Sequence, residues 1–214
     1  MTLQFPFSPR VRKPLAACLL ALVCGCGALT ASNEPLPTFF SLDRPASASG
    51  RPAVQAPAAG ITVVVNQPSA AAGFDSQRII YVRQPHELEY FAHNQWIDPP
   101  ARMLGPLIVG ALERSGAFRA VVHAPSTANG EMRLDTEIIL LQHEFTQRPS
   151  RVHFILRATL VESTARRVLA TREFEAYADA PSEDPYGGVQ AVNRVVASVL
   201  DDLAAFCAGV KPSR

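Results

Sequence analysis

"RLDTEIILLQHEF" at residues 133–145 and "RVHFILRATLVE" at residues 151–162 are the two stretches that decide the fold. Both are rich in apolar and β-branched residues, which favour strands. The segment between them contains Pro149 and Ser150, residue types that favour a turn. The two stretches therefore predict a long antiparallel hairpin.

The hydrophobic pattern of this hairpin also predicts its register. Pairing Phe145 with Val152 gathers the apolar side chains on one face, and a slip of one residue would scatter them. In this register Leu141 pairs with Leu156 and Ile139 with Ala158, and the predicted apolar face consists of Phe145, Leu141, Ile139, Val152, Phe154, Leu156 and Leu160.

The sequence after the hairpin predicts one more strand and a closing helix. "RRVLATREFEAYA" at 166–178 has strand character, and "DPYGGVQAVNRVVASVLDDLAAFC" at 184–207 has helical periodicity. Cys207 lies four residues after Leu203 and is expected to pack as a small apolar residue. The apolar stripe of the helix, at spacings of three and four, is Val189, Val192, Val196, Val199, Leu203 and Phe206.

The sequence before the hairpin predicts short strands and one further helix. The helix spans 98–116, with Asp98 as N-cap and Gly116 after the last turn. The predicted strands lie at 37–43, 61–65, 78–83, 87–91 and 118–122, and the Pro-, Ala-, Ser- and Gly-rich segment 43–60 is a flexible loop. The predicted fold class is therefore α/β, with a mixed, partly antiparallel sheet and two main helices packed on it.

The N-terminal segment has the features of a secretory signal peptide. Basic residues precede the apolar run "LAACLLALV" at 15–23, and small residues follow it. At a rise of ~1.5 Å per residue the run covers only about 14 Å, too little to span a bilayer as a helix. Val23 and Gly25 stand around Cys26 as in the lipobox of bacterial lipoproteins, which this segment resembles. We therefore expect cleavage after residue 25 and lipidation of Cys26.

Three other processing schemes remain open. Lipidation of Cys18 would leave an apolar region too short for a signal, and lipidation of Cys24 would put Val23 where a small residue is needed. An ordinary secretory signal would be cut after Ala28 or Ala31.

The expected domain organisation follows from cleavage before Cys26. Residues 1–25 form the signal peptide, 26–36 a tether and 37–210 the folded domain, which includes the loop 43–60. A lipoprotein cysteine carries three acyl chains, and stable anchoring takes more than one. In the lipoproteins that the segment resembles, an aspartate after the cysteine marks retention at the inner membrane. Gly27 stands at that place, which favours the periplasmic face of the outer membrane.

Composition and motifs argue against several function classes. The formal net charge is +1, and it falls to −2 without residues 1–25, so nucleic acid is not an expected partner. The sequence contains no nucleophile elbow, no phosphate-binding loop and no metalloprotease motif. No cofactor and no enzymatic activity are therefore expected. His143 and His153 share the predicted hairpin but point to opposite faces in the register above, so no metal site is expected either.

Aromatic residues near predicted turns are the remaining candidates for function. Side chains that combine an aromatic ring with a polar tip suit interfaces. We select Phe39, Phe40, Tyr81 and Trp96 as candidate partner contacts, although any of them could belong to the core instead.

Three motifs in this order resemble the ABC-type transport auxiliary lipoproteins. They are the aromatic pair in "FFSLD" shortly after Cys26, then "RIIYVRQPHELEYFAHNQWIDPP", then "MLGPLIVGALERSGAFRAVV" with its Ser-Gly stop and short strand. The likeness covers about residues 36–205. It implies a fold like the N-terminal domain of TolB.

The resemblance also implies a function. It indicates a non-enzymatic auxiliary component that accompanies an ABC permease and ATPase together with an MCE-domain protein, in the transport of lipids or other hydrophobic compounds. Two alternatives remain: a lipid-binding carrier with its own cavity, and an outer-membrane assembly lipoprotein that docks a β-barrel partner.

Overall fold

The structure is a computed structural model, and it describes residues 35–43 and 60–212. Every described helix and strand lies in the compact unit Pro37–Arg214. The expected signal peptide, Cys26, most of the expected tether and nearly all of the expected loop 43–60 lie outside the described residues.

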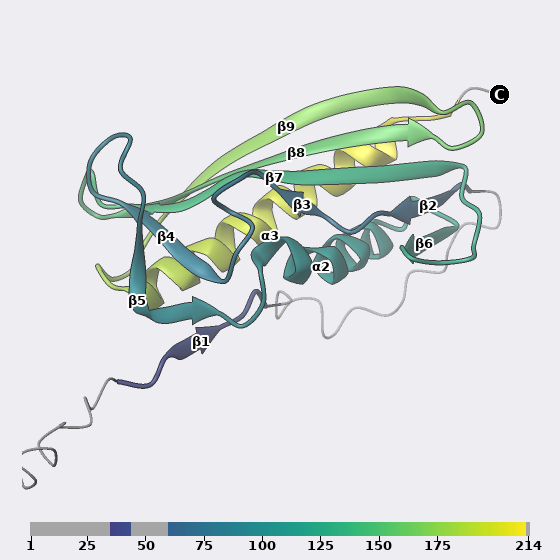
Figure 1. The fold of residues 1–214 in the computed structure, drawn as a ribbon. Coiled ribbons are helices and arrows are strands. Elements are labelled where there is room, and N and C mark those ends of the chain that lie inside the picture. Colours follow the sequence, from purple (N-terminus) through teal and green to yellow (C-terminus); the bar gives the residue numbers. More distant parts are fainter. Residues whose placement is uncertain (1–34, 44–59, 213–214) are drawn as a thin grey trace, which may run out of the picture. The chain divides into compact units, whose positions relative to one another are not determined.

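One long strand, β7, organises the sheet (Figure 1). On one side it pairs antiparallel with β8, which pairs antiparallel with β9, and on the other side it pairs with three short parallel strands that follow one another along its length. These strands are β7 (Met132–Glu144), β8 (Arg151–Glu162), β9 (Arg167–Asp179), β2 (Thr62–Val65), β3 (Ser69–Ala70) and β4 (Arg78–Val82).

Three further strands extend the sheet beyond these. Strand β6 (Ala120–His123) runs parallel to β2, β5 (Glu89–Trp96) runs antiparallel to β4, and β1 (Thr38–Phe40) runs parallel to β5. The predicted strand–turn–strand of β4 and β5 and the predicted edge strand β1 are thus confirmed.

Both helices pack on the same side of the sheet (Figure 1). Helix α3 (Pro185–Gly209) lies against β8 and β9, while α2 (Pro100–Ser115) lies against β2, β3, β6 and α3. The predicted α/β class, with a mixed, partly antiparallel sheet and two helices packed on it, is confirmed.

The predicted hairpin is confirmed, but its predicted register is wrong. Phe145 does not pair with Val152; that partner is His143. Leu141 pairs with Phe154, and an irregularity between Ile138 and Leu140 shifts the pairing again. Because of this β-bulge, Ile138 is buried in the core, and Ile139, which was predicted to face the core, is only half-buried.

The two helices begin differently. At α3 the Asp184 carboxylate accepts a 2.7 Å hydrogen bond from the Gly187 N–H and thereby caps the helix. At α2 the predicted N-cap Asp98 is wrong: Pro99 occupies that position, and no side chain caps the helix. Asp98 instead forms an ion pair with Arg102, 3.6 Å away. Gly116 ends α2 in the left-handed conformation, as expected.

The predicted stripe of α3 faces the core. Five of its six residues are buried, and Phe206 is half-buried. Cys207 is fully buried among them, which confirms its expected packing, and burial raises the pKa of its thiol to about 12.

Candidate partner-binding surface

The predicted contact residues Phe39 and Phe40 both lie on the short edge strand β1. Successive side chains of a strand point to opposite faces of the sheet. Phe39 pairs with Gln95 and is 49% exposed, whereas Phe40 pairs with Trp96 and packs partly against the core. The two rings therefore serve different surfaces.

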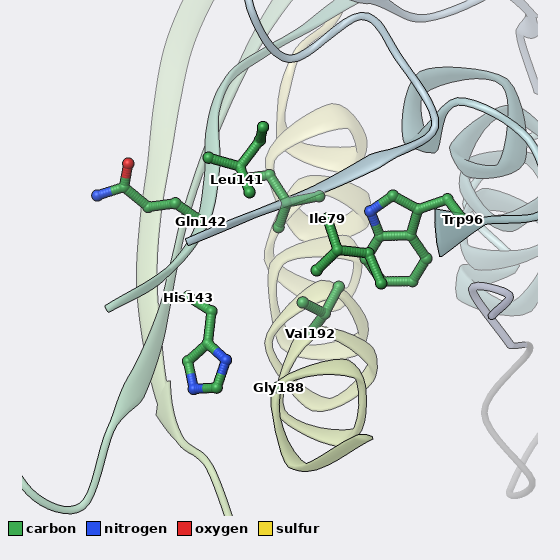
Figure 2. Close-up of a pocket in the computed structure, with 8 residues that line it drawn as sticks. Ile79, Trp96, Leu141, Gln142, His143, Gly188 and Val192 are labelled. Carbon is green, nitrogen blue, oxygen red and sulfur yellow. The ribbon is translucent and has the colours of Figure 1, made fainter. Parts of the chain in front are cut away.

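Trp96 is a core residue in the structure. Its side chain is 2% exposed, because β5 continues as a strand through Trp96 and turns the indole inward. Figure 2 shows the indole beside Ile79, close to Val192 of α3. It is therefore not part of an exposed surface. The strand predicted at 87–91 is longer than expected, because β5 ends only at Trp96 itself.

Tyr81 belongs to a cluster of three aromatic rings at the end of β7. Its ring centroid lies 4.5 Å from that of Phe91 and 5.9 Å from that of Phe145, the latter in an edge-to-face arrangement. We call Tyr81, Phe91 and Phe145 the aromatic cluster; all three are half-buried. Tyr81 pairs with His143 in the sheet, and the His143 ring lies against Gly188 of α3, so the cluster is on the helix-covered face near the start of α3.

Phe145 lies on the helix-covered face, in agreement with the predicted apolar face, but it is only half-buried there. Strand β7 ends at Glu144 and Val152 pairs with His143, so Phe145 lies just beyond the paired residues, where its ring meets Tyr81 and Phe91. Phe91 sits in the predicted strand 87–91, but no feature of the sequence shows that its ring meets Tyr81.

Polar groups hold the Tyr81 hydroxyl in place. This hydroxyl donates a 3.0 Å hydrogen bond to Glu89, and the Arg83 guanidinium donates two to the same carboxylate. The hydrogen bonds from Arg83 lower the pKa of Glu89, while burial raises the pKa of Tyr81. One edge of the aromatic cluster therefore carries a fixed polar group beside half-buried aromatic rings.

A buried polar pair lies behind the aromatic cluster. The His143 Nε2 atom is 2.8 Å from the Ser150 Oγ atom, and the Ser150 backbone N–H donates a 2.8 Å hydrogen bond to Glu183. Both His143 and Ser150 are almost fully buried, so a substrate cannot reach the hydroxyl in this conformation. The pair connects the turn after β7 with the segment that leads into α3.

The space around His143 is small. A cavity lies beside it and is lined by residues that include Leu141, Gly188 and Val192 (Figure 2). The volume in which the centre of a water molecule fits is about 10 Å³. That volume suits about one water and is far too small for an acyl chain. The His143 Nδ1 atom is buried and has no hydrogen-bond partner in the structure.

The two hairpin histidines lie on opposite faces, as predicted. His143 pairs with the buried Val152, whereas His153 pairs with Gln142 and stacks on Tyr177 at 4.2 Å between ring centroids. Across residues 35–43 and 60–212 there is no group of three or more His, Cys, Asp or Glu side chains arranged to hold a metal ion. None of the described helices is long and apolar enough to cross a membrane.

Comparison with known families gives a match over most of this domain. The sequence profile described as "ABC-type transport auxiliary lipoprotein component" matches residues 40–204. The chain belongs to this family. Membership of this lipoprotein family indicates a membrane-anchored protein of the cell envelope. The family is one of auxiliary components of ABC-type transport. Among curated proteins, no sequence matches this chain significantly.

Solved structures support the fold of the auxiliary lipoprotein. The crystal structure of the Xanthomonas campestris protein XCC0632 is similar, with 25% identity, a TM-score of 0.65, and coverage of 80% of this chain and 92% of that one. A structure of an uncharacterized protein has 12% identity and a TM-score of 0.62, and covers 80% and 99% of the two chains. The lipoprotein GNA1162 of Neisseria meningitidis, with 13% identity, a TM-score of 0.37 and coverage of 64% and 96%, is too distant to carry an argument.

Substituting Gly188→Ala should destabilise the auxiliary lipoprotein. The new Cβ atom would lie 2.5 Å from the His143 Nδ1 atom, and this ring is buried and held by Ser150. We expect a loss of about 1–3 kcal/mol in the free energy of unfolding, measured by urea denaturation. The control is Gly209→Ala in the same helix, whose Cβ would meet nothing within 4 Å. An equal effect of both substitutions would contradict the assigned contact.

Stability should fall as the pH is lowered from neutral towards 5. Burial lowers the pKa of His143 below its usual 6.5, although Glu183 and Asp184 nearby oppose this effect. The folded state therefore favours the neutral ring. Its contribution is fully present above about pH 6.5 and is lost as the pH falls through the lowered pKa in the folded state.

Urea midpoints of the wild type and of His143→Gln, measured between pH 7.5 and 5, check this prediction. The variant should show a flatter dependence on pH, because its amide does not titrate. Parallel curves would mean that another group causes the loss. Carboxylates with lowered pKa values, such as Glu144 and Asp184, act only at lower pH.

Proposed function

We propose that this auxiliary lipoprotein is a non-enzymatic, lipid-anchored accessory of an ABC transporter that moves lipids or other hydrophobic compounds across the periplasm. The match of residues 40–204 to the family is the observation that carries the proposal. The lipobox-like sequence around Cys26 supports an anchor, and the absence of a phosphate-binding motif from the sequence leaves ATP hydrolysis to another subunit.

The partner in this proposal is the complex of an ABC permease and ATPase with an MCE-domain protein. The aromatic cluster is the surface that we assign to this contact. It combines half-buried aromatic rings with the fixed Tyr81–Glu89–Arg83 group, and aromatic and Arg side chains are enriched in interface hot spots. Phe40 lies on the same face of the sheet as the buried Trp96, and we place it at the edge of the proposed contact surface.

The outer membrane is the proposed site of the anchor. The tether between Cys26 and the first strand is short, because the ten residues 27–36 extend over at most about 35 Å. The folded domain would therefore work close to the membrane surface. Its partner has to come within reach from the periplasm.

The alternative of a lipid carrier requires room for a lipid. The helices of this domain pack on the sheet through buried Val and Leu side chains, and the cavity beside His143 holds about one water. The cavity beside His143 therefore does not provide that room.

Cys26→Ala tests the anchor. We expect the variant to leave the membrane fraction and to appear in the periplasmic soluble fraction, because no acyl chains would hold it. Cys24→Ala is the matched control and should stay membrane-bound. Retention of the Cys26→Ala protein in membranes would refute anchoring through this residue.

Tyr81→Ala tests the partner surface. The full-length protein is solubilised gently from its native membranes, and co-purifying proteins are identified by mass spectrometry. We expect the wild type to recover an MCE-domain protein or an ABC permease, and Tyr81→Ala to lose most of this recovery because a central aromatic contact is removed.

Tyr177→Ala is the control, because Tyr177 is a 46% exposed tyrosine of β9 that stacks on His153, away from the aromatic cluster. Equal loss with both variants would point to general destabilisation. Recovery of a β-barrel protein, or of lipid alone, from the wild type would contradict the proposed function and favour one of the two alternatives.

A further inference from the structure

A second apolar surface lies on the other face of the sheet from the aromatic cluster. Phe39, Tyr90 and Ile97 are 49%, 51% and 54% exposed, although all three are large apolar side chains. With Arg78 and Gln95 between them they form what we call the outer patch.

Strand pairing brings the outer patch together. Phe39 of β1 pairs with Gln95 of β5, and Gln95 pairs with Arg78 of β4, so these three side chains share one face. The Arg78 guanidinium lies over the Tyr90 ring, 4.2 Å from its centroid. Ile97 follows directly after β5, and its N–H bonds to the Phe40 carbonyl of β1.

The charges around the outer patch favour an anionic surface. The two carboxylates directly adjacent to it in sequence form ion pairs: Glu89, next to Tyr90, with Arg83, and Asp98, next to Ile97, with Arg102. Among the described residues Arg78 forms no ion pair, and its guanidinium contacts the ring of Tyr90. Aromatic rings beside an arginine are typical of segments that sit at the headgroup level of a bilayer.

The position of the outer patch along the chain also favours a membrane. Phe39 lies only 13 residues after Cys26, so an extended tether places it at most about 45 Å from the lipidated residue. A folded domain on so short a tether meets the bilayer surface often. Each apolar side chain that enters the interface then adds to the anchoring by the acyl chains.

We infer that the outer patch is a membrane-contact surface, in which Phe39, Tyr90 and Ile97 enter the headgroup region of a phospholipid bilayer and Arg78 meets lipid phosphates. This contact orients the domain: the outer patch faces the lipid, while the aromatic cluster on the opposite face of the sheet stays open to the periplasm. The inference rests on the lipid anchor of the proposed function but not on the identity of the partner.

Site-specific fluorescence on the full-length lipoprotein tests this inference. The variants Phe39→Cys and Tyr90→Cys are labelled with an environment-sensitive NBD maleimide and reconstituted into vesicles of phosphatidylethanolamine and phosphatidylglycerol that contain doxyl-labelled lipid. Cys207 will not be labelled in the folded protein, because it is fully buried and its thiol pKa is raised to about 12. We expect blue-shifted emission and strong quenching at both positions.

The matched control is Val168→Cys, a 58% exposed position on β9. Quenching at positions 39 and 90 should exceed quenching at position 168 several-fold, and Arg78→Glu should reduce the quenching at position 39 by removing the contact with anionic lipid.

Equal, weak quenching at all three positions in vesicle-bound protein would overturn the membrane contact and leave the anchor intact. Shielding of position 39 only after the ABC–MCE complex is added would also overturn it and assign the outer patch to a protein partner. If the protein is instead found in the fraction without vesicles, the lipid anchor itself fails, and the inference fails with it.

Discussion

Strand β7 forms hydrogen bonds along both of its edges, and the rest of the domain depends on this pairing. One edge is occupied by the long antiparallel strand β8, whereas the other edge is shared by β2, β3 and β4 in succession. The short parallel strands have few hydrogen bonds of their own. They become stable because β7 presents a continuous edge and because α2 and α3 cover the apolar side chains beneath them.

The hairpin of β7 and β8 could be predicted from the sequence, but its register could not. Residues 138–141 are four consecutive apolar residues, so alternation gives no preference for one phase over the other. The β-bulge lies within this run of apolar residues. Ile138 is buried before the bulge and Leu141 is buried after it, although strict alternation would turn these two side chains to opposite faces. The strand can therefore keep an apolar side chain toward the helices at both ends, while its two halves differ in phase.

The exposure of the aromatic residues was the part of the candidate surface that sequence alone could not supply. Phe39 and Phe40 are adjacent identical residues, and only the pairing of β1 with β5 decides which ring is exposed. Trp96 lies beyond the strand predicted at 87–91, yet it completes β5 and fills space beside Ile79 and Val192. The helix stripe of α3 was predictable because a 25-residue helix repeats its period many times, whereas a three-residue strand carries almost no periodic signal.

Position in the sheet also explains why one end of this domain can serve two different contacts. Tyr81 and Tyr90 lie on the paired strands β4 and β5 but point to opposite faces, because Tyr90 pairs with Ile80, the neighbour of Tyr81. The cluster around Tyr81 is bounded by the start of α3, and its hydroxyl is fixed by Glu89. Tyr90 lies on the face of the sheet opposite to the helices, and its ring contacts the Arg78 guanidinium at the end of a long side chain. A partner with a defined shape suits the first environment, since its groups are fixed in place. A fluid surface suits the second, because side chains that adjust individually can enter a bilayer without a unique fit. The strand pairing that closes this end of the sheet therefore also separates a surface suited to protein recognition from one suited to lipid.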